Sequence, residues 1–224
     1  MNTLLGVARG LDSFARAVGK TIGWIMLPLI FVIMFDVITR KLDYTRLLFA
    51  GYTAESGVSV STILQDLEWH FHGALLLLTF GFGYLANAHV RVDVFRELLQ
   101  RRGQAKLELA GLIICAIPFL CLMIYYSFDM ALLSYHQGEG SESLTGIGER
   151  WIIKSMMVIG FVVAMLAVIT TLIRLIAYLF GDEASHLEAL NTLEIFTDDH
   201  EELEKARQEA ERALAESLRP GGGG

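Results

Sequence analysis

Acidic and basic side chains are nearly absent from four long stretches of this 224-residue chain. Each stretch is an apolar run of about 20 residues, which is what a helix needs to cross a hydrocarbon core about 30 Å thick. Hydrophobic residues make up 54% of the chain, too many for an ordinary soluble domain. Lipid offers no partner to free backbone groups, and buried strands are shorter than these runs. We therefore predict an all-α integral membrane protein with four transmembrane helices, at 22–39, 69–88, 109–128 and 155–173.

Cysteine is also scarce, and the two that are present, Cys115 and Cys121, lie six residues apart in the third stretch. Six residues rise about 9 Å along a helix, which is beyond disulfide reach. Neither cysteine belongs to a metal-ligand spacing.

We expect no catalytic residue, no metal, no cofactor site and no enzyme activity in this chain.

Charges between the apolar stretches predict the orientation. A basic leader precedes the first stretch, but no small-residue cleavage site follows it, so we predict a retained helix; a secretory signal is the alternative. Lysine and arginine mark the cytoplasmic side, and nine lie on one side against five on the other. Both termini are therefore predicted to be cytoplasmic. The predicted parts are an amphipathic leader at 1–20, a membrane domain at 21–180 and an acidic tail at 181–224.

The acidic tail accounts for the whole formal net charge of −7. From Asp182 onward, the chain has twelve acidic and four basic residues. The segment "DDHEELEKARQEAERALAESL" has acids at its start and the pair Glu201–Lys205 at i,i+4, which favours a charged cytoplasmic helix. Such a helix is either solvated or a docking site for another protein.

Charged groups are also missing from the middle of every predicted span, and no internal repeat is visible. Ion-coupled carriers usually need charged groups or broken helices at that depth, so a free-standing channel or carrier is disfavoured. Asp36, with Arg40 one turn later, is read as an interfacial ion pair, and a proton or sodium site is the alternative. Arg174 and Lys154 are predicted to reach water from helix ends.

Histidines suggest a second function class, a haem- or quinone-binding anchor of a respiratory enzyme. The candidates lie at the rims of the predicted spans, where imidazole also sits comfortably in the polar interface: His70, His72, His89 and His136. Small residues at close spacing indicate helix packing, within this chain or with another protein. They are Gly19 and Gly23, Gly81 and Gly83, and Gly160 and Ala164.

Two outer loops complete the pattern. The loop at 42–66 is long and mildly polar, and Ser61 or Thr62 is a plausible N-cap for the second helix. The second loop, "SYHQGEGSESLTGIGERW", is acidic, suited to a basic partner face or to solvent, and it ends at Trp151, an interfacial anchor.

The segments "EWHFHGALLLLTFGFGYLANAHVRVDVF" and "GEGSESLTGIGERWIIKSMM" resemble the small membrane subunit of tripartite ATP-independent periplasmic (TRAP) transporters, the DctQ-type component. The resemblance spans about 21–180, and "AHVRVD" is its most specific part. The usual proline before the tryptophan region is missing from "GIGERW". The matching residues are candidates for subunit contact or headgroup anchoring: His89, Arg91, Asp93, Glu68, Trp69, Glu142, Ser143, Trp151 and Lys154.

The resemblance implies a scaffold for a large multi-helix membrane subunit, which carries an organic acid and sodium. A periplasmic solute-binding protein would deliver the solute, and an ion gradient would drive its uptake. It also implies a multi-pass protein of the bacterial inner membrane that contacts lipids and no nucleic acid. We expect His89, Arg91 and Asp93 to fix the inner end of the bundle against the large subunit; a purely local membrane anchor is the alternative.

Overall fold

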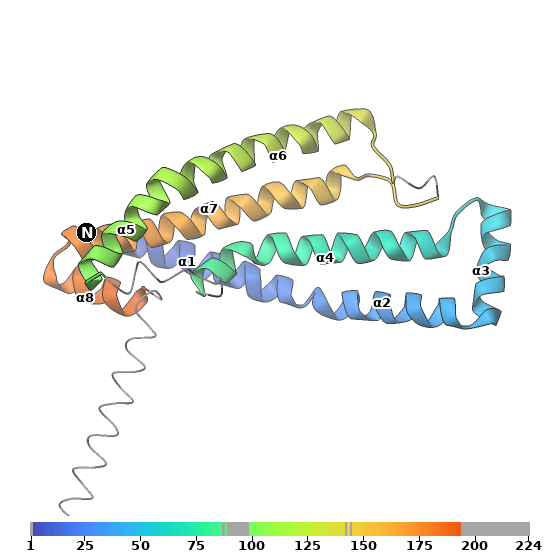
Figure 1. Ribbon diagram of the computed structural model, residues 1–224, viewed down its shortest axis with the longest axis horizontal. Coiled ribbons are helices and arrows are strands. Elements are labelled where there is room, and N and C mark those ends of the chain that lie inside the picture. Colours follow the sequence, from blue (N-terminus) through green and yellow to red (C-terminus); the bar gives the residue numbers. More distant parts are fainter. Residues whose placement is uncertain (1, 87, 89–98, 142, 144, 194–224) are drawn as a thin grey trace, which may run out of the picture.

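A computed structural model describes residues 2–86, 88, 99–141, 143 and 145–193 of the chain (Figure 1). Every element in these residues is helical, which confirms the all-α prediction. All of them are α-helices except one π-helical turn, η1, which joins α5 to α6. The elements are α1 (Asn2–Gly23), α2 (Met26–Lys41), α3 (Asp43–Ser56), α4 (Val60–Leu85), α5 (Arg101–Gly111), η1 (Leu112–Ala116), α6 (Ile117–Gln137), α7 (Trp151–Phe180) and α8 (Glu183–Thr192).

Three described helical stretches are long and apolar enough to cross a membrane: Thr3–Lys41, Arg101–Gln137 and Trp151–Phe180. They contain three of the four predicted spans. The remaining predicted span, 69–88, falls mostly on α4, which ends at Leu85 and is not among these three stretches. At 1.5 Å per residue its 26 residues extend about 39 Å, so its length suffices. Its first half, however, includes Asp66, Glu68, His70 and His72, which make it more polar.

The long helices run side by side, and short helices lie at both ends of the bundle (Figure 1). One end carries α3, which lies across the ends of α2 and α4; we refer to it as the α3 end. The opposite end carries α8, α5 and the start of α1, and we refer to it as the α8 end. Helix α7 is central, since it packs against α1, α4, α6 and α8.

The predicted leader forms α1 and belongs to the packed bundle. Its buried residues are spaced by three, seven and four positions, as expected for one face of a helix: Leu5, Ala8, Ala15 and Gly19. This face packs against α4 and α7. Helix α1 passes into α2 through a short turn at Trp24, whose side chain is exposed.

Glycines let the central helices approach closely. A Cβ added at Gly81 of α4 would lie 2.8 Å from the backbone oxygen of Val163, and one at Gly160 of α7 would lie 2.5 Å from that of Leu77. Gly19 of α1 packs closely against the side chain of Phe82 in α4. These small residues therefore serve packing within the chain, which resolves the open alternative for them.

Helix α6 packs on α7 and exposes much of its apolar surface. The π-helical turn η1 directly precedes Pro118, the second residue of α6. Proline has no N–H to continue an α-helical ladder, and a wider turn accommodates this interruption. The proline is therefore accommodated by a π-turn inside a continuous helical stretch. Cys115 and Cys121 are both exposed and free on its surface.

The loop expected at 42–66 contains the helix α3, which the sequence reading missed. Gly57 ends α3 in the left-handed conformation, with φ of 72°, and α4 then begins at Val60. The cap of α4 is Ser59, whose side chain accepts a hydrogen bond from the N–H of Thr62 at 3.4 Å. The predicted N-caps, Ser61 and Thr62, are therefore wrong. They lie two and three residues after Ser59, which caps the helix by accepting the hydrogen bond from Thr62.

Candidate functional site: a polar layer at each end of the bundle

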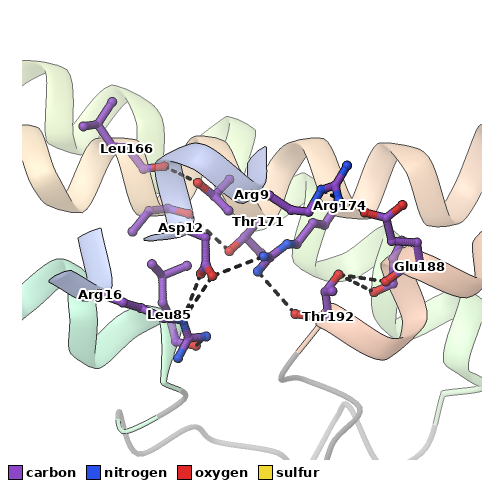
Figure 2. A network of polar contacts seen from close by, with 12 residues as sticks. Arg9, Asp12, Arg16, Leu85, Leu166, Thr171, Arg174, Glu188 and Thr192 are labelled. Atoms are coloured by element: carbon purple, nitrogen blue, oxygen red, sulfur yellow. Dashed lines mark hydrogen bonds and ion pairs between the residues drawn. The ribbon is translucent and has the colours of Figure 1, made fainter. Parts of the chain in front are cut away.

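A cluster of charged side chains lies at the α8 end, centred on Asp12 of α1 (Figure 2). The Nε atom of Arg16 donates to both carboxylate oxygens of Asp12 at 3.1 Å. Arg174 of α7 approaches the same carboxylate, with Nη2 3.5 Å from Oδ2. One carboxylate thus holds two guanidinium groups from two helices.

The same arginines also bind helix ends. Arg16 donates to the carbonyl oxygen of Leu85, the last residue of α4, at 3.2 Å. Arg174 donates to the carbonyl oxygen of Thr192, the last residue of α8, at 3.3 Å. The last carbonyls of a helix lack a partner inside the helix and carry partial negative charge, so they suit a cation. The cluster therefore joins α1, α4, α7 and α8, and we call it the α8-end layer.

Burial makes this layer different from a surface ion pair. Arg174 is only 6% exposed, so the prediction that its side chain reaches water is wrong. A buried charge requires a partner, and Arg174 finds one carboxylate and one carbonyl. Farther out, Arg9 pairs with Glu188 of α8 at 3.4 Å. The amphipathic pattern of the leader predicted its apolar face; it did not predict that the pair Asp12–Arg16 would meet Arg174.

At the α3 end, the predicted pair of Asp36 and Arg40 is confirmed. Arg40 Nη2 lies 2.9 Å from Asp36 Oδ2, and the aspartate is 5% exposed. With its amide oxygen turned to the guanidinium, Gln65 of α4 accepts from Arg40 at 2.9 and 3.3 Å. This contact ties α2 to α4.

The connection between α6 and α7 holds a second group of polar contacts. Lys154 of α7 donates to the Glu139 carboxylate, and the backbone N–H of Arg150 donates to the Glu139 carbonyl at 3.0 Å. The acid predicted to meet a partner or solvent is therefore paired within the chain. The hydrogen bond from Lys154 lowers the pKa of Glu139 below its ordinary value of 4.5.

This connection also reaches α4. The backbone N–H of Ile147 donates to Asp66 Oδ2 at 2.8 Å. Trp151 starts α7 and packs edge-on against Tyr135 of α6, with ring centroids 5.4 Å apart. Together with the pair Asp36–Arg40, these contacts form what we call the α3-end layer.

The predicted site residues divide into three groups. Ser143, Trp151 and Lys154 lie at the connection between α6 and α7, in the α3-end layer or beside it. Glu68 and Trp69 line a separate cleft between α4 and α2. Their roles in subunit contact or headgroup anchoring stay predictions. The remaining candidates fall outside the described residues: His89, Arg91, Asp93 and Glu142.

The described histidines lie on three elements: His70 and His72 on α4, His136 on α6 and His186 on α8. His70 contacts the carbonyl oxygen of Asp66 at 2.5 Å, His136 packs edge-on against Tyr135, and His186 stacks on Tyr178 with centroids 4.5 Å apart. Within the described ranges, no group of three or more His, Cys, Asp or Glu residues is placed to hold a metal ion.

Fold and site together define a multi-pass membrane protein of packed helices, with its charged contacts gathered at the two ends. The family model for tripartite ATP-independent periplasmic transporters, DctQ component, matches residues 29–177, which is more than half of the chain. The chain therefore belongs to the DctQ family, a family of transporter components, as the resemblance of "AHVRVD" and its neighbouring segments predicted. Neither a curated protein nor a solved structure matches it.

Proposed function

We propose that this chain is the small permease subunit of a TRAP-type secondary transporter. It scaffolds the large membrane subunit while an ion gradient drives uptake of an organic acid, and a periplasmic binding protein delivers that acid. Sodium binds the large subunit, and this chain carries no cofactor. The family membership supports the transporter class, and the packing of the helices supports the scaffold role.

One observation carries the scaffold role: the helical stretch of α1 and α2 and the central helix α7 carry almost no charge between the two end layers. Between Arg16 and Asp36, and between Lys154 and Arg174, the chain has no acidic side chain and one base, Lys20 near the α8 end. A carrier needs groups at the membrane midplane that bind its ion or solute. Backbone contact between α4 and α7 instead makes a tightly packed support.

The proposed membrane arrangement has four spans, with α4 as the second. Its length is sufficient, and its neighbours α2 and α7 cover part of its surface. The α8 end lies in the cytoplasm with both termini, and the α3 end faces the periplasm of a bacterial inner membrane. In this arrangement His89, Arg91 and Asp93 lie at the cytoplasmic face, as subunit contacts or headgroup anchors. The family match gives the haem- or quinone-anchor alternative no support.

Purification from native membranes tests the proposed function. The tagged chain, extracted in mild detergent, is expected to bring down a large multi-helix membrane protein in stoichiometric amount, identified by mass spectrometry. Deleting this chain is expected to abolish uptake of the corresponding solute, and re-expression to restore it. Recovery of the chain alone, or with a redox enzyme and a Soret absorption band, contradicts the proposal.

A further inference from the structure

A cleft of about 270 Å³ opens on the side of the bundle where α2 meets α4. Leu29 and Ile33 of α2 form its apolar wall, and Glu68, Trp69 and His72 of α4 form the other. Trp69 is 77% exposed, and His72 is exposed as well. A large aromatic ring, a carboxyl group and an imidazole thus share one open surface.

In the proposed four-span arrangement, the position along α4 places His72 within the hydrocarbon region and Glu68 close to its boundary at the α3 end. Leu85 marks the α8-end layer through its bond with Arg16. His72 precedes it by 13 residues and Glu68 by 17, which at 1.5 Å per residue correspond to about 20 and 26 Å. Both distances are shorter than the hydrocarbon thickness of about 30 Å.

Neither polar group is satisfied by its described neighbours. Within the part of the chain that the structure describes, no side-chain hydrogen bond or ion pair of Glu68 or His72 is present. Asp36, also on α2 and also near the α3 end, has both Arg40 and a buried position. Hydrocarbon offers nothing to a carboxyl or an imidazole group, and in membranes such groups face protein or water.

Building on the proposed function, we propose that this cleft is where the large membrane subunit docks. A transmembrane helix of that subunit places an apolar side chain between Leu29, Ile33 and Trp69. It presents a hydrogen-bond donor, or a basic group, to Glu68. Polar side chains that bond across helices and an exposed tryptophan beside a pocket are both features of helix–helix and protein–protein contacts.

A lipid headgroup fits this surface less well. Phosphate and amine groups lie at the membrane surface, whereas His72 is about 10 Å farther along α4 than that surface by the same rise per residue. Acyl chains at this depth satisfy only Leu29, Ile33 and the tryptophan ring. A protein helix supplies both kinds of partner at once.

Site-specific photo-crosslinking in native membranes tests the docking. The residue p-benzoylphenylalanine replaces Trp69, and in a matched control it replaces Phe119, a 56% exposed aromatic residue of α6. Helix α6 lies at the opposite edge of the bundle from α2 (Figure 1). We expect the probe at position 69 to form a covalent product with the large subunit, in at least several-fold excess over the probe at 119.

A second variant pair tests the polar contact. Glu68→Gln is expected to lower recovery of the large subunit several-fold in detergent, whereas Glu55→Gln on the exposed surface of α3 is expected to leave it unchanged. Thermal melting of each purified variant checks that the bundle is intact. Glu68→Gln should melt like the unmodified chain, because its carboxylate has no partner among the described residues.

The possible outcomes separate the docking from the proposed function. If the unmodified chain recovers the large subunit but crosslinks only from position 119, or only to lipid from position 69, the docking is wrong and the proposed function stands. Equal recovery with Glu68→Gln and Glu55→Gln overturns the polar contact. If the unmodified chain recovers no large subunit, both the docking proposal and the proposed function are wrong.

Discussion

The two polar layers differ in how far along the chain their members come from. At the α8 end, Asp12 and Arg174 meet from α1 and α7, and the arginines reach on to the ends of α4 and α8. At the α3 end, Asp36 and Arg40 are one turn apart, and Glu139 pairs with Lys154 within one helix–helix connection.

This difference predicts a mechanical asymmetry. In the α8-end layer, Arg16 and Arg174 bind the carboxylate of Asp12 and also bind the ends of α4 and α8. Four helices are therefore linked through one cluster, which fixes that end of the bundle as a unit. The α3-end layer ties α2 to α4 and α6 to α7 separately, and the bond from Ile147 to Asp66 links the two pairs. A support that is rigid at one end and loosely linked at the other leaves room for a partner to adjust the outer helices.

The largest expected effect comes from disturbing the packing between the layers. Gly160→Ala places a methyl group 2.5 Å from the backbone oxygen of Leu77, so α4 and α7 must separate. We expect a loss of about 3 kcal/mol, the upper part of the usual range for overpacking. Thermal unfolding in detergent, followed by circular dichroism, measures it.

A matched control for this variant is Gly10→Ala in α1, where an added Cβ meets nothing within 4 Å. Replacing an exposed helical glycine by alanine is expected to stabilise by up to about 1 kcal/mol. If both variants melt alike, the close contact between α4 and α7 is not the packing that sustains the bundle.

Removing the central carboxylate of the α8-end layer is the next largest effect. Asp12→Asn leaves two guanidinium groups facing each other without their shared anion. Among the described residues, Arg174, at 6% exposure, then has no carboxylate beside it and faces the carbonyl of Thr192 and a neutral amide. We expect a loss of about 2 kcal/mol, as for a charged hydrogen bond that is partly buried. Protease accessibility of the α8 segment should rise together with this loss.

The comparison variant is Asp43→Asn on α3, which removes an ion pair with Arg46 whose side chains are 66% and 83% exposed. Exposed pairs contribute at most about 1 kcal/mol, so this change should be close to neutral. A loss equal to that of Asp12→Asn would mean that burial at the α8 end adds nothing to its ion pairs.

Local patterns account for what could be read from the sequence. Asp36 and Arg40 were predicted as a pair because residues four apart on a helix face each other. The apolar face of α1 followed from its periodicity in the same way. Close packing at Gly81 and Gly160 was expected from their small size, although the choice between internal and external partners needed coordinates.

The features that the sequence did not predict depend on contacts between distant segments or on helices with weak periodicity. Asp12 and Arg174 are 162 positions apart, and nothing in either neighbourhood points to the other. The sequence did not predict helix α3 because its polarity does not follow its burial: Thr45, Phe49 and Thr53 are half-buried, while Leu47 and Leu48 are exposed. Its periodicity is therefore weak. Helix α8 escaped for a similar reason, since its ten residues are mixed in polarity.

The smallest expected effect belongs to the α3-end layer and depends on pH. Lys154 lowers the pKa of Glu139, so the folded chain holds this carboxylate in its charged form more strongly than the unfolded chain does. That stabilisation is fully present above about pH 4.5, the ordinary value, and is lost as the pH falls through the lower folded value.

The variant Glu139→Gln isolates this contribution, because all other carboxyl groups titrate alike in both proteins. The unmodified chain is expected to melt slightly higher than the variant at pH 7, by less than the Asp12→Asn difference, since the pair is partly exposed. The two melting temperatures should converge as the pH falls below 4.5. A melting-temperature difference that stays constant, or grows, toward acid pH would show that Glu139 acts through its shape and not through its charge. The contrast between a charged α8-end layer and a weakly held α3-end layer would then rest on Asp12 alone.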